Sequence, residues 1–155
     1  MPTVHMVCGA PGAGKTTYAR ALADAKRCLC LSVHEWMKVL FEMDAPQPPE
    51  RAWTLERAAR CEAQMWLVAD SLLARGADVV FDVDLATVSH RDAFRSRIAH
   101  TRAETKMHYL DVGQETRRAR VLATGVTQAD FDLMDRRFEA PSDDELSGAM
   151  IVCDH

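Results

Sequence analysis

The sequence lacks a long apolar run, a leader-like start and a block of basic residues. No stretch approaches the roughly 20 uninterrupted apolar residues that a membrane-spanning helix needs. The N-terminus does not show the basic and then apolar segments that are typical of a secretory signal peptide. These absences lead us to expect a cytoplasmic protein that does not contact a membrane.

The charge balance also argues against an extended nucleic acid as partner. The net charge is −4, and no long run of Lys and Arg is present. Affinity for a phosphate backbone through counterion release depends on many such side chains. A small molecule is therefore a better expectation, although a local basic patch is compatible with the composition. The sequence does not indicate an oligomeric state.

The cysteines lack the spacing of a zinc site or a disulfide framework. There are five of them, an odd number, and none belongs to a paired CxxC pattern. We expect reduced and mostly buried thiols. The five are Cys8, Cys28, Cys30, Cys61 and Cys153.

The overall composition, with 48% hydrophobic and 27% charged residues, is typical of a globular protein, and the length predicts one domain covering residues 1–155. Apolar β-rich runs alternate with segments of helical spacing, which predicts a parallel sheet with helices on both faces, an α/β fold. Expected strands are 3–8, 27–32, 78–82, 105–112 and 149–153, and expected helices are 15–25, 33–41, 50–75, 87–100, 114–123 and 127–139.

Helical spacing in the 50–75 segment predicts one buried face, and the segment 87–100 has two possible N-caps, Thr87 and Ser89. The expected buried face of 50–75 consists of Leu55, Ala58, Ala59, Met65, Trp66, Ala69, Leu72 and Leu73.

The stretch GAPGAGKT at residues 9–16 matches the phosphate-binding pattern GxxxxGK[ST] between an expected strand and an expected helix. Backbone N–H groups of such a loop surround phosphate oxygens, and the following helix presents its positive end to them. Lys15 would reach the β- and γ-phosphates, and the Thr16 hydroxyl would bind Mg²⁺. A dinucleotide fingerprint is excluded because Thr17 stands where its last glycine belongs. The candidate nucleotide-binding residues are Gly9, Ala10, Pro11, Gly12, Ala13, Gly14, Lys15, Thr16 and Thr17.

Two carboxylates lie at and just after the end of the apolar run DVVFD, residues 78–82. Asp82 has the form of a Walker B carboxylate, which holds Mg²⁺ directly or through water; the alternative is a strand-end aspartate that caps a turn. Asp84 would share the metal or meet the substrate. The candidate metal residues are thus Thr16 and Asp82.

His34 and Glu35 follow the second expected strand, near the edge where parallel strands gather around a ligand. Either side chain would accept the proton of a hydroxyl that is being phosphorylated, or both lie on the surface of a helix.

Arginines recur after the fourth expected strand, at positions 117, 118 and 120. Arg117 and Arg120 are candidates for stabilising transferred phosphate, because guanidinium groups match its spreading negative charge. A solvated basic helix face is the alternative. Arg91, Arg136 and Arg137 are weaker candidates of the same kind.

With these motifs in place, the chain resembles the small bacterial ATP-binding P-loop kinases related to polynucleotide kinase, chloramphenicol phosphotransferase and zeta-toxin kinases. The matching segments are GAPGAGKTTYARALA, LSVHEWMKVLF, RCEAQMWLVADSLLARGADVVFD, HYLDVGQETRRARV and DRRFEAPSDDEL. The resemblance implies a three-layer α/β/α P-loop nucleoside-triphosphate hydrolase fold with a five-stranded sheet of nucleoside-kinase type. It also implies ATP and Mg²⁺ as cofactors, a hydroxyl acceptor beyond the second strand, and RFEAPSDDE as the loop on the adenine side.

The chain departs from those relatives at three places. His34 stands where they usually carry an aspartate as the general base, and Thr124 stands where they carry a second lid arginine. The lid between Arg120 and Phe131 is also short. A neutral imidazole accepts protons near neutral pH, so His34 is compatible with catalysis.

Two hypotheses result. The first is a kinase that transfers the γ-phosphate of ATP to a hydroxyl of a small-molecule or nucleoside-like acceptor. The second is a catalytically weak ATP-binding regulatory protein, which His34, Thr124 and the short lid motivate. A polynucleotide 5′-hydroxyl kinase is a further alternative, disfavoured by the acidic net charge.

Overall fold

The computed structural model describes residues 1–153 and contains a five-stranded parallel sheet in the order β2-β3-β1-β4-β5. This arrangement confirms the expected α/β fold of P-loop kinases. The strands are β1 (Thr3–Gly9), β2 (Leu29–Ser32), β3 (Val79–Asp82), β4 (Glu104–Asp111) and β5 (Met150–Cys153).

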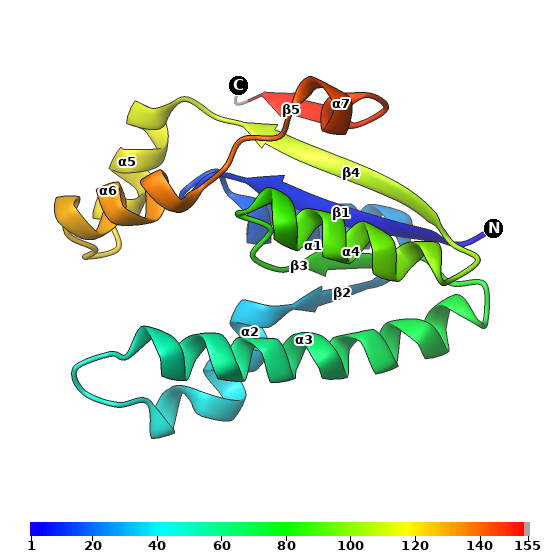
Figure 1. Ribbon diagram of the computed structural model, residues 1–155, viewed down its shortest axis with the longest axis horizontal. Helices are drawn as coiled ribbons and strands as arrows, with labels where there is room; N and C mark the ends of the chain where they lie inside the picture. The colour runs from blue at the N-terminus through cyan, green and yellow to red at the C-terminus, as the bar shows by residue number, and fades with distance from the viewer. Residues whose placement is uncertain (154–155) are drawn as a thin grey trace.

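Seven α-helices and one 3-10 turn connect the strands within the described residues (Figure 1). They are α1 (Lys15–Lys26), α2 (Val33–Phe41), η1 (Glu42–Asp44), α3 (Arg51–Leu73), α4 (Val88–Ala99), α5 (Gln114–Leu122), α6 (Gln128–Arg137) and α7 (Asp143–Leu146). No helix in residues 1–153 is both long and apolar enough to span a bilayer.

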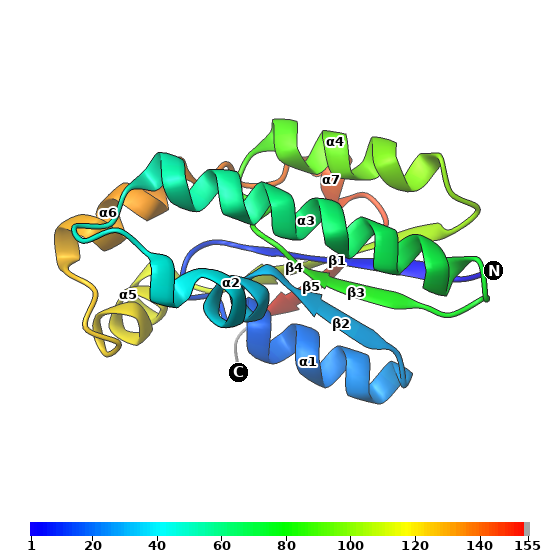
Figure 2. The ribbon, with the colours of Figure 1, turned by 90° about the horizontal axis from the view of Figure 1, so that it is seen from below.

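Helices cover both faces of the sheet, with α3 and α4 on one side and α1 on the other (Figure 2). The α3–α4 side encloses the larger core, where Trp66, Phe81 and Phe94 pack with ring centroids 4.6 to 4.9 Å apart. β1 lies in the middle of the sheet and is buried from Val4 to Gly9, as its apolar sequence requires. The loop that follows β1 is thus attached to a buried central strand.

The α3 helix differs from its expected face at the N-terminal end. Leu55 and Ala59 are exposed, and Cys61 is buried instead. The reason is that the first half of α3 extends beyond the sheet and packs against α2, and Leu55 lines a cavity there instead of the core (Figure 1). Thr87 was confirmed as the N-cap of α4, since its side chain accepts a bond from His90 N.

α7 was missed from the sequence, although its N-terminus has a sequence signal. Ser142 and Glu145 form a capping box, the S-x-x-E pattern in which each side chain binds the other residue's backbone N–H. The helix was missed because the four residues after Ser142 are too few and too polar to show the apolar periodicity of a helix.

The cysteines are free, as expected, but they are less buried than expected. Cys8 and Cys61 are buried, Cys28 and Cys30 are partly exposed, and Cys153 is exposed.

Three polar side chains connect β1, β4 and α1 by hydrogen bonds; His5 and His108 are buried and Tyr18 is half-buried. His5 Nδ1 lies 2.9 Å from His108 Nε2, and His108 Nδ1 lies 2.8 Å from the Tyr18 hydroxyl. Burial lowers the pKa of His108 to about 4 and also lowers the pKa of His5. Both imidazoles are therefore held in the neutral form at neutral pH.

Candidate functional site

The GAPGAGKT loop connects β1 to α1 at the end of the sheet where the parallel strands terminate (Figure 1). Its sharp course depends on Gly12 and Gly14, which have φ angles of 79° and 88°. These values lie in the left-handed region that glycine adopts without a Cβ penalty. Gly14 is the N-cap residue of α1 and makes no side-chain cap, so the first-turn N–H groups of the helix remain available to a phosphate.

Lys15 lies inside this loop. Its Nζ donates to the carbonyl oxygens of Gly9 at 2.9 Å and Ala10 at 3.3 Å. Burial lowers the pKa of Lys15, while the carboxylates of Asp84 and Asp82 raise it in opposition. The ammonium group is thus positioned at the loop's inner surface, where phosphate oxygens would lie.

Asp82 is completely buried at the end of β3 and binds two hydroxyl groups. Its Oδ2 accepts from Thr16 Oγ1 at 2.7 Å and from Ser32 Oγ at 2.8 Å. Its Oδ1 is buried and has no hydrogen-bond partner among the described residues. A buried orphan carboxylate oxygen beside the Thr16 hydroxyl fits the ligand chemistry of Mg²⁺, directly or through water.

No cluster of three or more His, Cys, Asp and Glu side chains in residues 1–153 could hold a metal ion by itself. Mg²⁺ in such sites is usually bound by one or two protein groups together with substrate phosphates and water. Thr16 and Asp82 therefore suit a metal that arrives with a nucleotide.

A cavity of about 760 Å³ begins at the phosphate-binding loop and continues between α2, α3, α4 and α6. Its volume is in the range of small-molecule sites. Lys15 and Thr16 lie at one end, and the side chains of His34, Arg51, Asp84 and Arg137 line the walls beyond them. One cavity is thus shared by the loop and by residues far from it in sequence.

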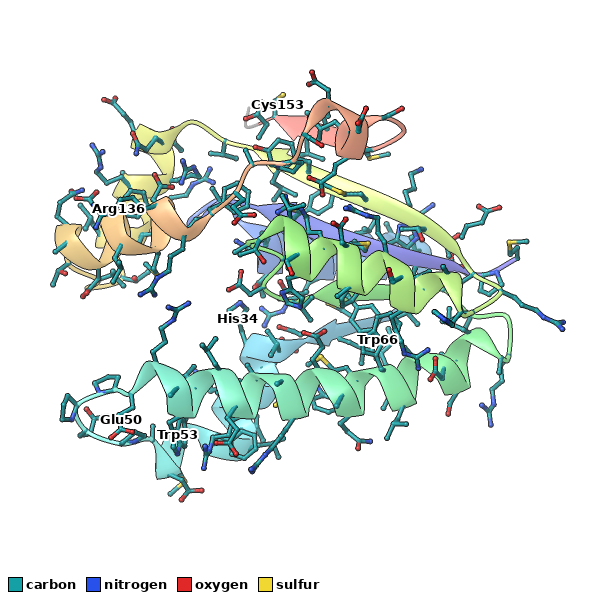
Figure 3. The ribbon with its side chains drawn as sticks, in the orientation of Figure 1. His34, Glu50, Trp53, Trp66, Arg136 and Cys153 are labelled. Carbon is teal, nitrogen blue, oxygen red and sulfur yellow. The ribbon has the colours of Figure 1, made fainter. Side chains whose placement is uncertain are left out.

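The structure separates His34 from Glu35, which the sequence left as alternatives. His34 lines the cavity, and Figure 3 shows it between the sheet and α3. Glu35 forms an ion pair with Arg20 of α1 and is not among the residues that line the cavity. Ser32 caps α2 and fixes the direction of this first turn.

Arg117 lies in a buried position that the sequence did not reveal. Its guanidinium donates to Val112 O at 2.9 Å, to Pro11 O at 3.2 Å and to Asp135 Oδ1 at 2.6 Å. Burial raises the pKa of Asp135, but Arg117 and Gln114 outweigh this effect, and the pKa lies below its usual value. The guanidinium of Arg117 binds groups of the protein itself, whereas the sequence led us to expect that it contacts the transferred phosphate.

Arg120 and Arg91, two other arginine candidates, have different surroundings. Arg120 is exposed, and its Nη1 lies 3.4 Å from Gly12 O, beside the phosphate-binding loop. Arg91 is fully buried and binds Glu145 through two nitrogens, at 2.8 and 3.1 Å, so it stabilises the fold. The guanidinium of Arg91 lowers the pKa of Glu145 to about 2.

The RFEAPSDDE segment divides between the cavity and α4. Arg137 and Phe138 line the cavity at the phosphate-binding loop, whereas Glu139 accepts from Val88 N and Glu145 binds Arg91. The expected place of this segment beside adenine stays a prediction. A second hollow, of about 420 Å³, lies beside the other flank of the phosphate-binding loop, and Thr17, Arg120 and Val152 line it. The RFEAPSDDE residues are not among those that line this hollow.

Sequence reasoning missed Ser32, Arg51 and His90 as site residues. Ser32 lies opposite Asp82 in the pairing of β2 with β3. The alternation of apolar residues in the sequence does not predict which residues of two strands lie opposite each other. His90 lines the cavity and binds Glu62 Oε2 at 3.0 Å. The hydrogen bond that His90 donates to Glu62 raises the pKa of His90 against the effect of burial.

Comparison with solved structures shows this fold in kinases. A candidate kinase from Chloroflexus aurantiacus aligns with a TM-score of 0.78 at 19% identity, over 99% of this chain and 84% of that one. A gluconokinase from Sinorhizobium meliloti aligns with a TM-score of 0.63 at 16% identity, over 98% and 82%. The APS kinase of Mycobacterium tuberculosis, solved with AMPPNP and APS, aligns with a TM-score of 0.66 at 15% identity, over 98% and 88%.

No curated protein matches the sequence significantly. The narrower resemblance to polynucleotide kinase, chloramphenicol phosphotransferase and zeta-toxin kinases stays a prediction. A family model described as AAA domain matches residues 4–141, from the start of β1 to the segment before α7. This match covers most of the chain and includes the phosphate-binding loop, and the protein belongs to the AAA domain family.

Proposed function

We propose that the protein is an ATP-dependent phosphotransferase that moves the γ-phosphate of ATP to a hydroxyl of a small-molecule or nucleoside-like acceptor. The observation that carries this proposal is the single cavity that joins the phosphate-binding loop to His34. A protein that only bound ATP would not need the part of this cavity that extends beyond Lys15 to His34. The kinase fold of the gluconokinase and the APS kinase supports the same reaction type.

ATP would occupy both sides of the loop. The phosphates would contact the loop backbone and Lys15, and the hollow beside Thr17 and Val152 would receive the base. Arg120 lies between these two regions, where its charge would meet the phosphates. Thr16 and Asp82 would hold Mg²⁺, which when bound neutralises charge on the β- and γ-phosphates.

The phosphoryl transfer requires a general base and an acceptor hydroxyl held close to the γ-phosphorus. His34 would accept the proton of the acceptor hydroxyl as that oxygen bonds to the γ-phosphorus. The bond from the γ-phosphorus to the β–γ bridging oxygen breaks, and ADP leaves with that oxygen. His34 suits this role because its side chain is exposed to the cavity and makes no hydrogen bond or ion pair with any described residue.

The test is incubation with ATP and Mg²⁺ and a panel of sugars, sugar acids, nucleosides, alcohols, antibiotics and 5′-hydroxyl oligonucleotides, with mass spectrometry of the products. At least one acceptor is expected to gain one phosphoryl group while ADP forms. General-base catalysis typically contributes 10²–10⁴-fold, so His34→Ala is expected to lower kcat by about that factor. Glu35→Ala is the matched control, because Glu35 pairs with Arg20 outside the cavity. Bound ATP without any phosphorylated product would contradict the proposal.

The burial of Arg117 favours a second candidate, an ATP-binding protein with little turnover. Arg117 is committed to Asp135 and to two carbonyl groups, and Thr124 ends α5 by donating to Val121 O at 2.6 Å. Under this alternative, the double variant His34→Asp with Thr124→Arg would gain phosphotransfer that the parent lacks. High turnover in the parent would rule the alternative out.

A further inference from the structure

Two arginines line the acceptor end of the cavity without partners of their own. Arg51 is the first residue of α3, and Arg137 is the last residue of α6. Both side chains line the cavity. Neither side chain forms a hydrogen bond or an ion pair with another residue in the part of the chain that the structure describes.

The positions of these arginines set them apart from the other arginines of the same helices. On α3, Arg57 and Arg60 both bind Glu56. On α6, Arg136 is exposed and is not among the residues that line the cavity. Figure 1 shows the first turn of α3 and the last turn of α6 on opposite sides of the space at the end of the sheet. The two unpaired guanidinium groups thus reach one cavity from two walls.

The charge of the cavity is opposite to the charge of the protein. Lys15, Arg51 and Arg137 line the cavity, and Asp84 is the one carboxylate among its lining residues within 1–153. The whole chain has a net charge of −4. Because Lys15 would be engaged by the phosphates of ATP, the charge of the two arginines remains for the second substrate.

We infer that the acceptor is an anionic alcohol: a hydroxyl compound whose carboxylate, sulfate or phosphate group is bound by Arg51 and Arg137 while its hydroxyl faces His34. This inference rests on the proposed kinase function and defines its substrate class. Arginine suits the task because its planar fork of N–H donors matches the oxygens of a carboxylate or a phosphate. A neutral alcohol would leave both guanidinium groups without an acceptor, so it binds less tightly.

The first experiment measures anion binding alone. AMPPNP and Mg²⁺ occupy the nucleotide site, and sodium sulfate is titrated against the complex by calorimetry, with sodium chloride of equal ionic strength as reference. Wild type is expected to bind one sulfate. The double variant Arg51→Gln with Arg137→Gln is expected to raise the Kd at least tenfold, and Arg136→Gln is expected to leave it unchanged. Circular dichroism and thermal unfolding verify that each variant is folded.

The second experiment compares matched acceptors. Glucose is assayed beside gluconate and glucose 6-phosphate, and adenosine beside adenosine monophosphate, which separates carboxylate from phosphate as the recognised group. The anionic member of a pair is expected to have the higher kcat/KM. Each single variant, Arg51→Gln or Arg137→Gln, is expected to raise the KM for that acceptor tenfold or more without changing the KM for ATP.

Sulfate that fails to bind the wild-type complex, or binds the double variant equally well, overturns the inference. Preference for the neutral acceptors overturns it as well. Failure of the proposed function gives a different result, namely no AMPPNP binding or no transfer to any acceptor. Sulfate titration without nucleotide still compares the variants in that case, since all of them keep the phosphate-binding loop.

Discussion

Gly12 gives a quantitative prediction, because two separate physical effects exclude a side chain there. Its φ of 79° lies in the left-handed region. A Cβ at this position would lie 2.6 Å from Arg117 O and 2.8 Å from Val121 Cγ2. The first contact is with backbone of α5, which cannot rotate away as a side chain can. Gly12→Ala therefore forces either the loop or α5 to move.

The cost is the sum of the two effects. The left-handed conformation costs a residue with a Cβ about 1–2 kcal/mol. Overpacking of a close contact typically costs about 1–3 kcal/mol. Gly12→Ala is therefore expected to lower the free energy of unfolding by about 2–5 kcal/mol. For a chain of this size, each kcal/mol corresponds to about 2–4 °C in Tm.

Gly125→Ala is the matched control. Gly125 has a φ of 93°, and an added Cβ would meet no atom within 4 Å. This variant carries only the backbone effect and is expected to cost about 1–2 kcal/mol. Urea unfolding followed by circular dichroism measures both variants against wild type. Equal losses in the two variants would refute the claim that α5 is packed against the loop at Gly12.

Three further predictions concern charged and polar groups. Asp82→Asn keeps the size of the buried side chain but removes its charge, and it is expected to lower Mg²⁺ affinity or kcat about 10–100-fold, read from turnover against Mg²⁺ concentration. Glu145→Ala leaves Arg91 buried without its partner and is expected to cost about 3–5 kcal/mol in urea unfolding at pH 7, whereas a loss below 1 kcal/mol would show that the pair is dispensable. Because burial lowers the pKa of His108 from 6.5 to about 4, the unfolded state binds the proton first, and stability falls by about 3 kcal/mol as the pH drops from about 6.5 to 4. His108→Gln is expected to flatten this decline in unfolding free energy, and an unchanged pH profile would assign it to other groups.

Local sequence patterns predicted the parts of the site that depend on neighbouring residues. The GAPGAGKT loop, the strand before it and the helix after it are contiguous, so spacing alone defines them. Asp82 was found for the same reason, as the polar end of an apolar strand. Its partner Ser32 was not found, because the bond between them depends on which strands are neighbours in the sheet.

The end of the cavity beyond the phosphate-binding loop depends on tertiary packing, and the sequence did not define it. Arg51 and Arg137 are 86 residues apart in the sequence and reach one cavity because the first turn of α3 and the last turn of α6 lie on two sides of it. The sequence around a single arginine in a helix does not indicate whether its side chain faces solvent, a carboxylate or a cavity. The same holds for His34 and Glu35: His34 lines the cavity and Glu35 pairs with Arg20, and the sequence did not distinguish the two.

Arg117 connects the parts of the site that the sequence treated separately. One guanidinium binds Pro11 of the phosphate-binding loop, Val112 at the end of β4, and Asp135 of α6. Since α6 also carries Arg137, the position of this wall of the cavity is coupled through Arg117 and Asp135 to the position of the phosphate-binding loop. The guanidinium of Arg117 thus links the phosphate-binding loop to α6 inside the protein, whereas the exposed side chain of Arg120, on the same helix, lies beside the loop.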